Sequence, residues 1–183
     1  MKTTKQWVAL FSQSGKEICD IAEKIGRYPD QIVTDSSVDK MDKRIFNCKH
    51  ITIKTYKGLH TVDKFLYYLN EFSVYDNNCL FTLHGWLNIV PPTICEKFLI
   101  YNGHPGLINV YPELKGRDPQ ERAWKNISGY EFVGSVIHRV TPEVDEGQIC
   151  NYIQTEASKC TSLEQTYNVL RETSLKSWID FLS

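Results

Sequence analysis

The chain has 183 residues, which fits one domain with a substantial buried core better than two domains. Its apolar content of 42% and charged content of 23% are those of a globular protein rather than a disordered one. The formal net charge of −1 excludes an overall cationic field, so we expect no nucleic-acid partner.

Neither a membrane span nor an export signal is expected. No run of about 18 apolar residues occurs, and the apolar segment Trp7–Phe11 is shorter than the hydrophobic region of a signal peptide. We therefore expect a cytoplasmic protein with no membrane partner. The six cysteines include no closely spaced pair, which favours buried free thiols over disulfides and predicts no metal site.

The first half of the chain alternates between strand and helix patterns. Apolar runs predict strands at Trp7–Ser12, Gln31–Asp35, His50–Thr55 and Cys79–Trp86. Apolar residues at helical spacing predict helices at Gly15–Gly26 and Thr61–Phe72, and shorter ones at Ser37–Phe46 and Pro92–Leu99. Gly26 is expected to end the first helix.

The second half begins with a strand, Phe98–His104, that ends where polar residues start. A helix is predicted at Asp118–Ile127, with Asp118 as its N-cap and Pro119 at the first helical position. Two further strands at Glu131–Val140 and Gln148–Ala157 precede a long helix that closes the chain. Thr161 or Ser162 is expected to cap that last helix.

Strand–helix alternation predicts an α/β fold of Rossmann-like type, with a mostly parallel twisted sheet flanked by helices. The last two strands leave little room for a helix between them, so we expect an antiparallel addition near the C-terminal end. We expect residues 1–183 to form a single domain. In such sheets the ligand crevice lies outside the carboxyl ends of the strands, where Asn102, His104 and the turn after the first strand fall.

Three polar side chains, Asn102 and His104 after one strand and Asp145 after another, could share one site. The Asn102 amide can donate to a developing oxyanion, and the His104 imidazole can polarise a carbonyl or move a proton near neutral pH. The Asp145 carboxylate can orient that imidazole or accept a proton through water. No Ser or Cys is placed as a nucleophile, which favours direct attack of one substrate on another. Spacing alone leaves the alternative that these segments are ordinary turns.

The ordered pattern N-x-H-P-x-L followed by H-x-V-T-x-x-x-D-x-G-x-I resembles the folate-dependent formyltransferase family. The matching residues are Asn102, His104, Pro105, Leu107, Gly116, His138, Val140, Thr141, Asp145, Gly147 and Ile149. The resemblance is strong over about residues 80–149 and weaker before them. It implies an enzyme of one-carbon metabolism, a transferase whose residues 1–183 form the formyltransferase catalytic domain.

The resemblance also implies the chemistry. The co-substrate would be 10-formyltetrahydrofolate, and a primary amine of a small acceptor, phosphorylated or nucleotide-linked, would receive the formyl group. Asn102, His104 and Asp145 match the catalytic positions of the family. Asn102 and His104 would stabilise the tetrahedral oxyanion, and Asp145 would support His104 and take up the proton of the amine through a water.

Binding residues are implied in the same way, and no metal is. The reduced folate would lie against residues that follow the fourth strand, Trp86, Leu87, Asn88, Ile89 and Val90, with Thr141 and Val144 on its other side. The turn "SQSGK" offers hydroxyls, helix N-terminal N–H groups and one cation, so Ser12, Ser14, Gly15 and Lys16 are expected to bind the acceptor. This turn matches the phosphate turn of the glycinamide ribonucleotide enzymes poorly.

Several alternatives stay open. The acceptor could be phosphoribosylglycinamide itself, water could replace the amine in a formyltetrahydrofolate hydrolase, or the chain could be a folate-binding module without activity. The long loop after His104 carries Lys115 and Arg117, which could contact the acceptor or be plain surface charges. His138 is as well explained by a structural role as by a place near the site, and a structural role is favoured for His84.

Overall fold

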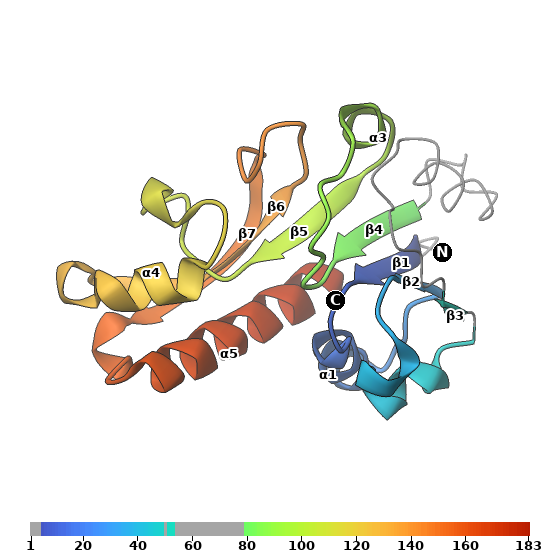
Figure 1. Ribbon diagram of the computed structural model, residues 1–183, viewed down its shortest axis with the longest axis horizontal. Helices are drawn as coiled ribbons and strands as arrows, with labels where there is room; N and C mark the ends of the chain where they lie inside the picture. The colour runs from blue at the N-terminus through green and yellow to red at the C-terminus, as the bar shows by residue number, and fades with distance from the viewer. Residues whose placement is uncertain (1–4, 50, 54–78) are drawn as a thin grey trace. The chain divides into compact units, whose positions relative to one another are not determined.

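The computed structural model describes residues 5–49, 51–53 and 79–183 (Figure 1). The predicted helix Thr61–Phe72 and the ends of the predicted strand His50–Thr55 lie outside these residues. The chain divides into two compact units. The N-terminal unit comprises Met1–Tyr101 with Val140–Pro142, and the C-terminal unit comprises Asn102–Arg139 with Glu143–Ser183.

The sheet of the N-terminal unit is parallel, as predicted. Its strands are β1 (Gln6–Phe11), β2 (Gln31–Thr34), β3 (Ile51–Ile53) and β4 (Cys79–Leu83). They lie in the order β3-β2-β1-β4, and β4 lies next to the start of β5 (Ile100–His104). Ala9 in β1 pairs with Ile32 of β2 and with Thr82 of β4, so β1 is a central strand. Its residues Trp7–Phe11 are all buried, as a strand covered on both faces requires.

Helix α1 (Lys16–Ile25) follows β1 and is bounded by two glycines in the left-handed conformation. Gly26, with φ 71°, donates its N–H to the carbonyl of Ala22, which confirms the predicted stop. The predicted short helix Ser37–Phe46 is wrong in type. The structure has two 3-10 turns there, η1 (Val38–Lys40) and η2 (Lys43–Asn47), separated by Met41 in an extended conformation.

The second short helix of this unit, α3 (Pro92–Lys97), begins at a proline as predicted. Its residues Ile94 and Cys95 are buried in a core that also includes Val8, Phe81, Phe98 and Ile100. The rings of Phe81 and Phe98 meet edge to face at 5.5 Å. This core fixes the carboxyl ends of β1, β2 and β4, from which the binding residues proposed below extend.

The C-terminal unit holds the last three residues of β5 and an antiparallel pair. Strands β6 (Phe132–Arg139) and β7 (Ile149–Glu156) pair antiparallel, with a register shift between Ile137 and His138. A Cβ on Gly134 of β6 would overlap the carbonyl group of Ile153 in β7, so this position admits only glycine. The predicted antiparallel addition is confirmed, and with it the α/β fold class.

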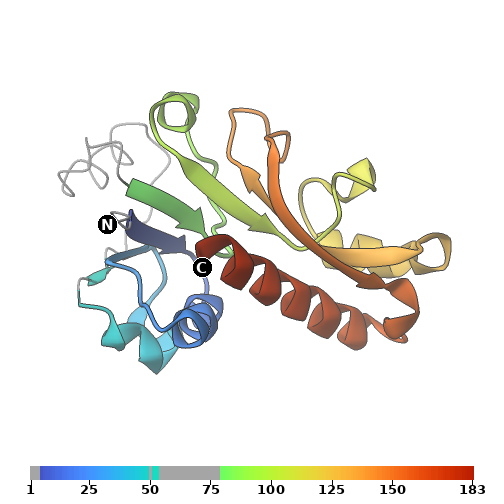
Figure 2. The ribbon, with the colours of Figure 1, turned by 180° about the vertical axis from the view of Figure 1, so that it is seen from behind.

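Two helices belong to this unit. Helix α4 (Pro119–Lys125) has Asp118 at its N-cap position as predicted, but Asp118 has φ 52° and its side chain makes no capping hydrogen bond. Helix α5 (Leu163–Leu182) packs along β6 and β7 (Figure 2), and Ser162 caps it by accepting from the N–H of Gln165. Short 3-10 turns complete the unit: η3 (Pro112–Leu114), η4 (Ile127–Gly129) and η5 (Ala157–Lys159).

The core of the C-terminal unit joins these helices to the strands. Leu107, Leu114, Val136 and Leu170 are buried in it. All six cysteines of the chain are free thiols, and five are buried as expected, whereas Cys150 is exposed. In the part of the chain that the structure describes, no helix is long and apolar enough to cross a membrane.

Candidate functional site

The site begins at the end of β5, where Asn102 and His104 stand two positions apart and so face the same side of the strand. Gly103 lies between them in extended backbone rather than in the turn that an Asn-Gly pair favours. A Cβ there would lie 2.9 Å from Cε2 of Trp178, a fully buried residue of α5. The glycine therefore lets the indole pack against the face of β5 opposite the two polar side chains.

His104 is buried, with 5% of its surface exposed, and both of its ring nitrogens face acceptors. Nε2 lies 2.9 Å from the carbonyl oxygen of Leu114, which can only accept, so Nε2 carries the proton and donates it. Nδ1 lies 3.3 Å from Oδ2 of Asp145. Burial lowers the pKa of His104 below its usual value, and the carboxylate of Asp145 only partly offsets this effect.

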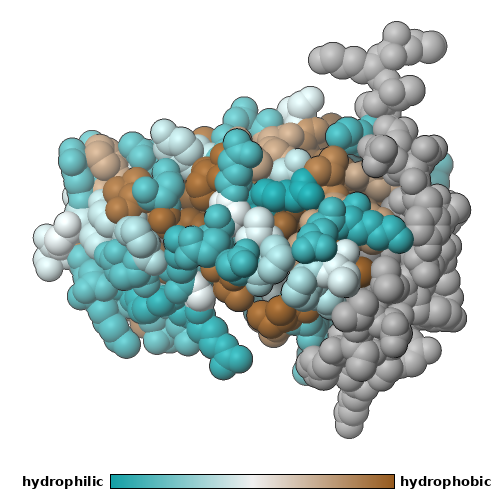
Figure 3. Space-filling model, turned by 90° about the horizontal axis from the view of Figure 1, so that it is seen from above, coloured by the Kyte–Doolittle hydropathy of each residue, from teal (hydrophilic) through white to brown (hydrophobic). Residues whose placement is uncertain are grey.

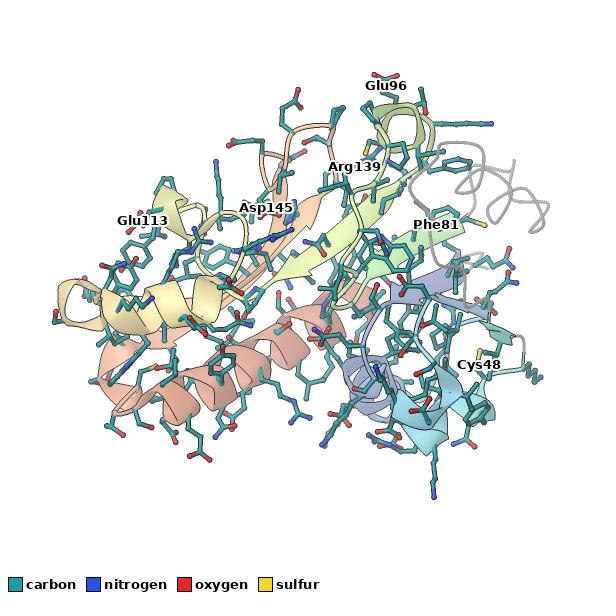
Figure 4. All side chains as sticks on the ribbon, viewed as in Figure 1. Cys48, Phe81, Glu96, Glu113, Arg139 and Asp145 are labelled. Carbon is teal, nitrogen blue, oxygen red and sulfur yellow. The ribbon has the colours of Figure 1, made fainter. Side chains whose placement is uncertain are left out.

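Asp145 lies in the loop between β6 and β7 (labelled in Figure 4) and has φ 57°, a conformation uncommon for a residue with a side chain. Its Oδ2 accepts the N–H of Gly116 at 2.8 Å, and its Oδ1 lies 3.3 Å from Nε2 of His138. Burial alone would raise the pKa of Asp145, but His138, His104 and the Gly116 N–H together lower it to about 2. The side chain is therefore a carboxylate at neutral pH.

His138 belongs to the same cluster, so the structure resolves the alternative that the sequence left open. Its Nε2 lies 3.2 Å from Nδ2 of Asn102, and its Nδ1 lies 3.0 Å from the carbonyl oxygen of Arg139. The rings of His104 and His138 are 6.5 Å apart. Asn102, His104, His138 and Asp145, all in the C-terminal unit, thus form one connected group.

The loop after His104 supplies backbone groups that sequence patterns could not reveal. Arg122 donates to the carbonyl oxygens of Glu113, Leu114 and Lys115, which fixes the Leu114 carbonyl that His104 contacts. Lys115 pairs with Glu146 at 2.7 Å, next to Asp145 in the sequence. An arginine that bonds three successive carbonyls leaves no spacing signal, because its partners are main-chain atoms.

The turn predicted to bind the acceptor lies in the N-terminal unit. Gly15, with φ 69°, precedes α1, and the hydroxyl of Ser14 accepts the N–H of Lys16 at 3.3 Å. Ser12 has a different function, since its hydroxyl accepts the N–H of Leu87 at 3.1 Å and contacts Nδ2 of Asn88 at 3.5 Å. Ser12 therefore ties this turn to the segment predicted to bind folate.

The segment predicted to bind folate, residues 86–90, exposes some of its apolar side chains and buries others. Leu87 and Ile89 are 71% and 69% exposed, and hydrophobic patches reach the surface among hydrophilic ones in Figure 3. Val90, by contrast, is buried in the core, and Trp86 packs against that core. Asn88 donates to Oδ2 of Asp35 at 2.9 Å, which together with Ser12 fixes the loop.

The last two predicted folate contacts fall in different units. Thr141 belongs to the N-terminal unit, next to Val140, whose N–H donates to the carbonyl of Ile100. Val144 belongs to the C-terminal unit and is 54% exposed. His84, for which a structural role was favoured, is buried between Oε2 of Glu17 and Oγ1 of Thr82, each at 2.9 Å.

Comparison with known proteins identifies solved structures that have the same fold as this chain. No protein-family model matches the chain. The crystal structure of phosphoribosylglycinamide formyltransferase from Streptococcus pneumoniae superposes with a TM-score of 0.76 at 21% identity, covering 96% of each chain. This chain has the fold of the phosphoribosylglycinamide formyltransferases. A formyltetrahydrofolate deformylase from Pseudomonas syringae also matches, with a TM-score of 0.73 at 14% identity over 98% of this chain and 60% of that one.

One curated relative is similar in sequence. The phosphoribosylglycinamide formyltransferase of Dictyostelium discoideum is 32% identical over 87 residues, which are 44% of this chain and 41% of that protein. The match thus spans about two-fifths of the relative's length. This relative and the Streptococcus pneumoniae structure are both named as phosphoribosylglycinamide formyltransferases, which confirms the resemblance found from the motifs.

Proposed function

We propose that this chain is an enzyme that transfers the formyl group of 10-formyltetrahydrofolate to a primary amine of a small acceptor. The names of the similar proteins make phosphoribosylglycinamide the first acceptor to test. The observation that carries the proposal is the connected group that Asn102, His104 and Asp145, the residues that match the formyltransferase motif, form with His138.

The reaction joins the amine nitrogen to the formyl carbon and turns the formyl oxygen into an oxyanion. The carbon–nitrogen bond to tetrahydrofolate then breaks, the folate nitrogen takes up a proton, and the amine loses one. Asn102 suits the oxyanion, because an amide N–H that is held in place stabilises charge only as that charge develops. Loss of one such donor typically slows an enzyme by about 10² to 10³.

We assign to His104 the positive charge that the oxyanion needs. Protonation at Nδ1, 3.3 Å from Asp145, completes an imidazolium–carboxylate pair while Nε2 still donates to Leu114. A carboxyl group whose pKa is about 2 is a weak base. We therefore assign to Asp145 the stabilisation of the imidazolium, and the proton of the amine leaves through water rather than resting on the carboxylate.

Residues outside the catalytic group are proposed to bind the substrates. The exposed side chains of Leu87 and Ile89 offer apolar surface to the pterin ring, with Thr141 and Val144 as further contacts. Ser14, Gly15 and Lys16 at the start of α1 suit a phosphate on the acceptor, because N–H groups at a helix N-terminus and a cation favour an anion.

The proposal is tested by mixing the protein with 10-formyltetrahydrofolate and following tetrahydrofolate release together with formylated product. Phosphoribosylglycinamide, other phosphorylated amines, amino sugars and amino-nucleotides serve as acceptors. We expect release that depends on an amine and equals the product formed. No release with any acceptor, in a protein shown to be folded, would sink the proposal.

The deformylase among the structural neighbours makes hydrolysis a second candidate. Water would then take the place of the amine, and formate rather than a formamide would appear. Release of tetrahydrofolate at full rate without any amine would select this reaction. We further propose a cytoplasmic location and no nucleic-acid partner, in keeping with the net charge of −1.

A further inference from the structure

His138 lies beside the residue that is proposed to hold the oxyanion, yet it has no place in the chemistry above. It is 2% exposed and lies in β6, where the register with β7 shifts. Its Nε2 lies 3.2 Å from Nδ2 of Asn102, while its Nδ1 lies 3.0 Å from the main-chain oxygen of Arg139. Each ring nitrogen thus has a partner of fixed position.

The partner of Nδ1 determines the tautomer. A carbonyl oxygen can only accept, so Nδ1 must carry a proton to make the 3.0 Å contact. In the neutral ring Nε2 is then an acceptor, and the group facing it must be a donor. The amide of Asn102 meets this requirement with its Nδ2 end.

The carboxylate of Asp145 provides a check on this arrangement. Its Oδ1 lies 3.3 Å from the same Nε2 and cannot donate, so it can bond to that nitrogen only when the ring is an imidazolium. An imidazolium would donate at Nε2 and would favour the oxygen end of the Asn102 amide. The structure has the nitrogen end of the amide toward the ring, the arrangement in which Nε2 accepts from Asn102.

We propose that His138 is a positioning residue that fixes which end of the Asn102 amide faces the substrates. With one N–H of Nδ2 donated to His138, the second N–H is held for the oxyanion, and the amide cannot turn over. Without an acceptor at this position the amide can present its oxygen to the formyl oxygen, which is repulsive. This inference rests on the proposed function, because it assigns Asn102 the oxyanion.

The decisive variants are His138→Gln and His138→Met, which have similar length but differ in hydrogen bonding. The oxygen of a glutamine side chain can accept the Asn102 N–H where Nε2 did, whereas methionine offers only a weak acceptor. We expect His138→Met to lower kcat by about 10² or more, as for a lost oxyanion donor, and His138→Gln to stay within about tenfold of the parent. The KM for the folate should change little in both.

A control identifies a merely structural effect. His84 is also buried with both ring nitrogens in contact with partners, Glu17 and Thr82. We expect His84→Met to lower the free energy of unfolding but to leave kcat within about threefold, because His84 makes its hydrogen bonds to Glu17 and Thr82. Equal losses of kcat in the Gln and Met variants at position 138 would overturn the proposal.

The double variant with Asn102→Ala makes the test specific. If His138 acts through Asn102, then His138→Met should add less than about threefold to the loss of kcat already caused by Asn102→Ala. Multiplicative losses would mean that the two residues act separately and would overturn the proposal.

A second readout does not depend on activity. The ¹⁵N chemical shifts of the imidazole report which ring nitrogen is protonated, and we expect the Nδ1–H tautomer for His138 with Nε2 as acceptor. A proton on Nε2 of the neutral ring would overturn the positioning proposal even if formyl transfer is found. Absence of transfer by the parent chain would overturn the proposed function instead, so the two failures are distinct.

Discussion

The indole of Trp178 occupies the space that a Cβ on Gly103 would need. Gly103 separates the two site residues of β5, so packing in the core of the C-terminal unit and geometry in the site depend on the same position. Trp178 is fully buried in α5 and cannot move toward solvent without leaving that core.

Gly103→Ala should therefore lower both stability and turnover. We expect a loss of about 1–3 kcal/mol in the free energy of unfolding, as for overpacking of a core, and a fall in kcat because the displaced strand carries Asn102 and His104. Urea unfolding and steady-state kinetics measure the two effects. Gly129→Ala is the matched control, since nothing lies within 4 Å of a Cβ at Gly129. A Gly103→Ala protein as stable and active as the control would contradict the assigned packing.

Asn102→Ala should lower kcat by about 10² to 10³ with little change in folate affinity, because the amide is assigned to the transition state alone. Fluorescence titration with reduced folate gives the affinity, and single-turnover kinetics give the rate. Asn109→Ala, at an exposed position of the loop that follows, should behave as the parent. A large loss of folate binding in Asn102→Ala would make Asn102 a binding residue.

Asp145→Asn should fold yet lose turnover by orders of magnitude, because the amide cannot stabilise an imidazolium at His104, 3.3 Å away. The loss should appear in kcat rather than in KM. Glu146→Gln, at a neighbouring exposed position, is the control for removing one negative charge from this loop. Turnover of Asp145→Asn near that of Glu146→Gln would refute the role given to Asp145.

The same carboxylate should make stability depend on pH in the acid range. An aspartate has a pKa of about 3.9 in an unfolded chain, and the fold lowers that of Asp145 to about 2. A depressed pKa stabilises the fold above the unfolded value, so the contribution is present above about pH 4 and lost as pH falls through about 2. Its size is on the order of 2 kcal/mol.

Unfolding of the parent and of Asp145→Asn across the acid range measures this contribution. The difference in unfolding free energy between the two should be largest near neutral pH and should narrow between about pH 4 and pH 2. A difference that stays constant over that range would show that the carboxylate gains nothing from ionising in the folded protein.

Ser12→Ala should raise the KM for 10-formyltetrahydrofolate by about fivefold with kcat nearly unchanged, since one hydrogen bond to the 86–88 loop contributes about 1 kcal/mol. Ser12 accepts the N–H of Leu87, which lies in the proposed folate surface. Ser14→Ala is the comparison, because its hydroxyl bonds within the turn and its loss should act on the KM for the acceptor. The assignment fails if Ser12→Ala alters the acceptor KM alone.

Much of the fold followed from apolar patterning, because buried strands and amphipathic helices leave strong periodic signals. The start of α1 after Gly15 and its stop at Gly26 are examples. Where apolar patterning gave a wrong prediction, the local backbone conformation determined the structure instead. Extended backbone at Met41 splits the expected helix at Ser37–Phe46, and a left-handed Asp118 keeps its side chain from capping α4.

The sequence could predict the side chains of the site but not the main-chain atoms that contact them. The motif named Asn102, His104 and Asp145, which the structure brings into one group. The Leu114 and Arg139 carbonyls that fix the two histidine tautomers are main-chain atoms, which every residue has, so no sequence pattern marks them. Gly103 follows Asn102 in an Asn-Gly pair, which favours a turn. Its actual constraint is the contact with Trp178, which lies far along the chain and leaves no local sequence signal.

Gly134 has a consequence for how the hairpin of β6 and β7 finds its alignment. Strands can slip by two residues and keep the same faces in and out, so hydrophobic patterning alone does not forbid that error. A slip of two would bring Phe132 or Val136 against the Ile153 carbonyl, where only a hydrogen atom fits. The absence of a Cβ at Gly134 thus disfavours the misaligned hairpins. It thereby determines which residue of β7 lies opposite His138.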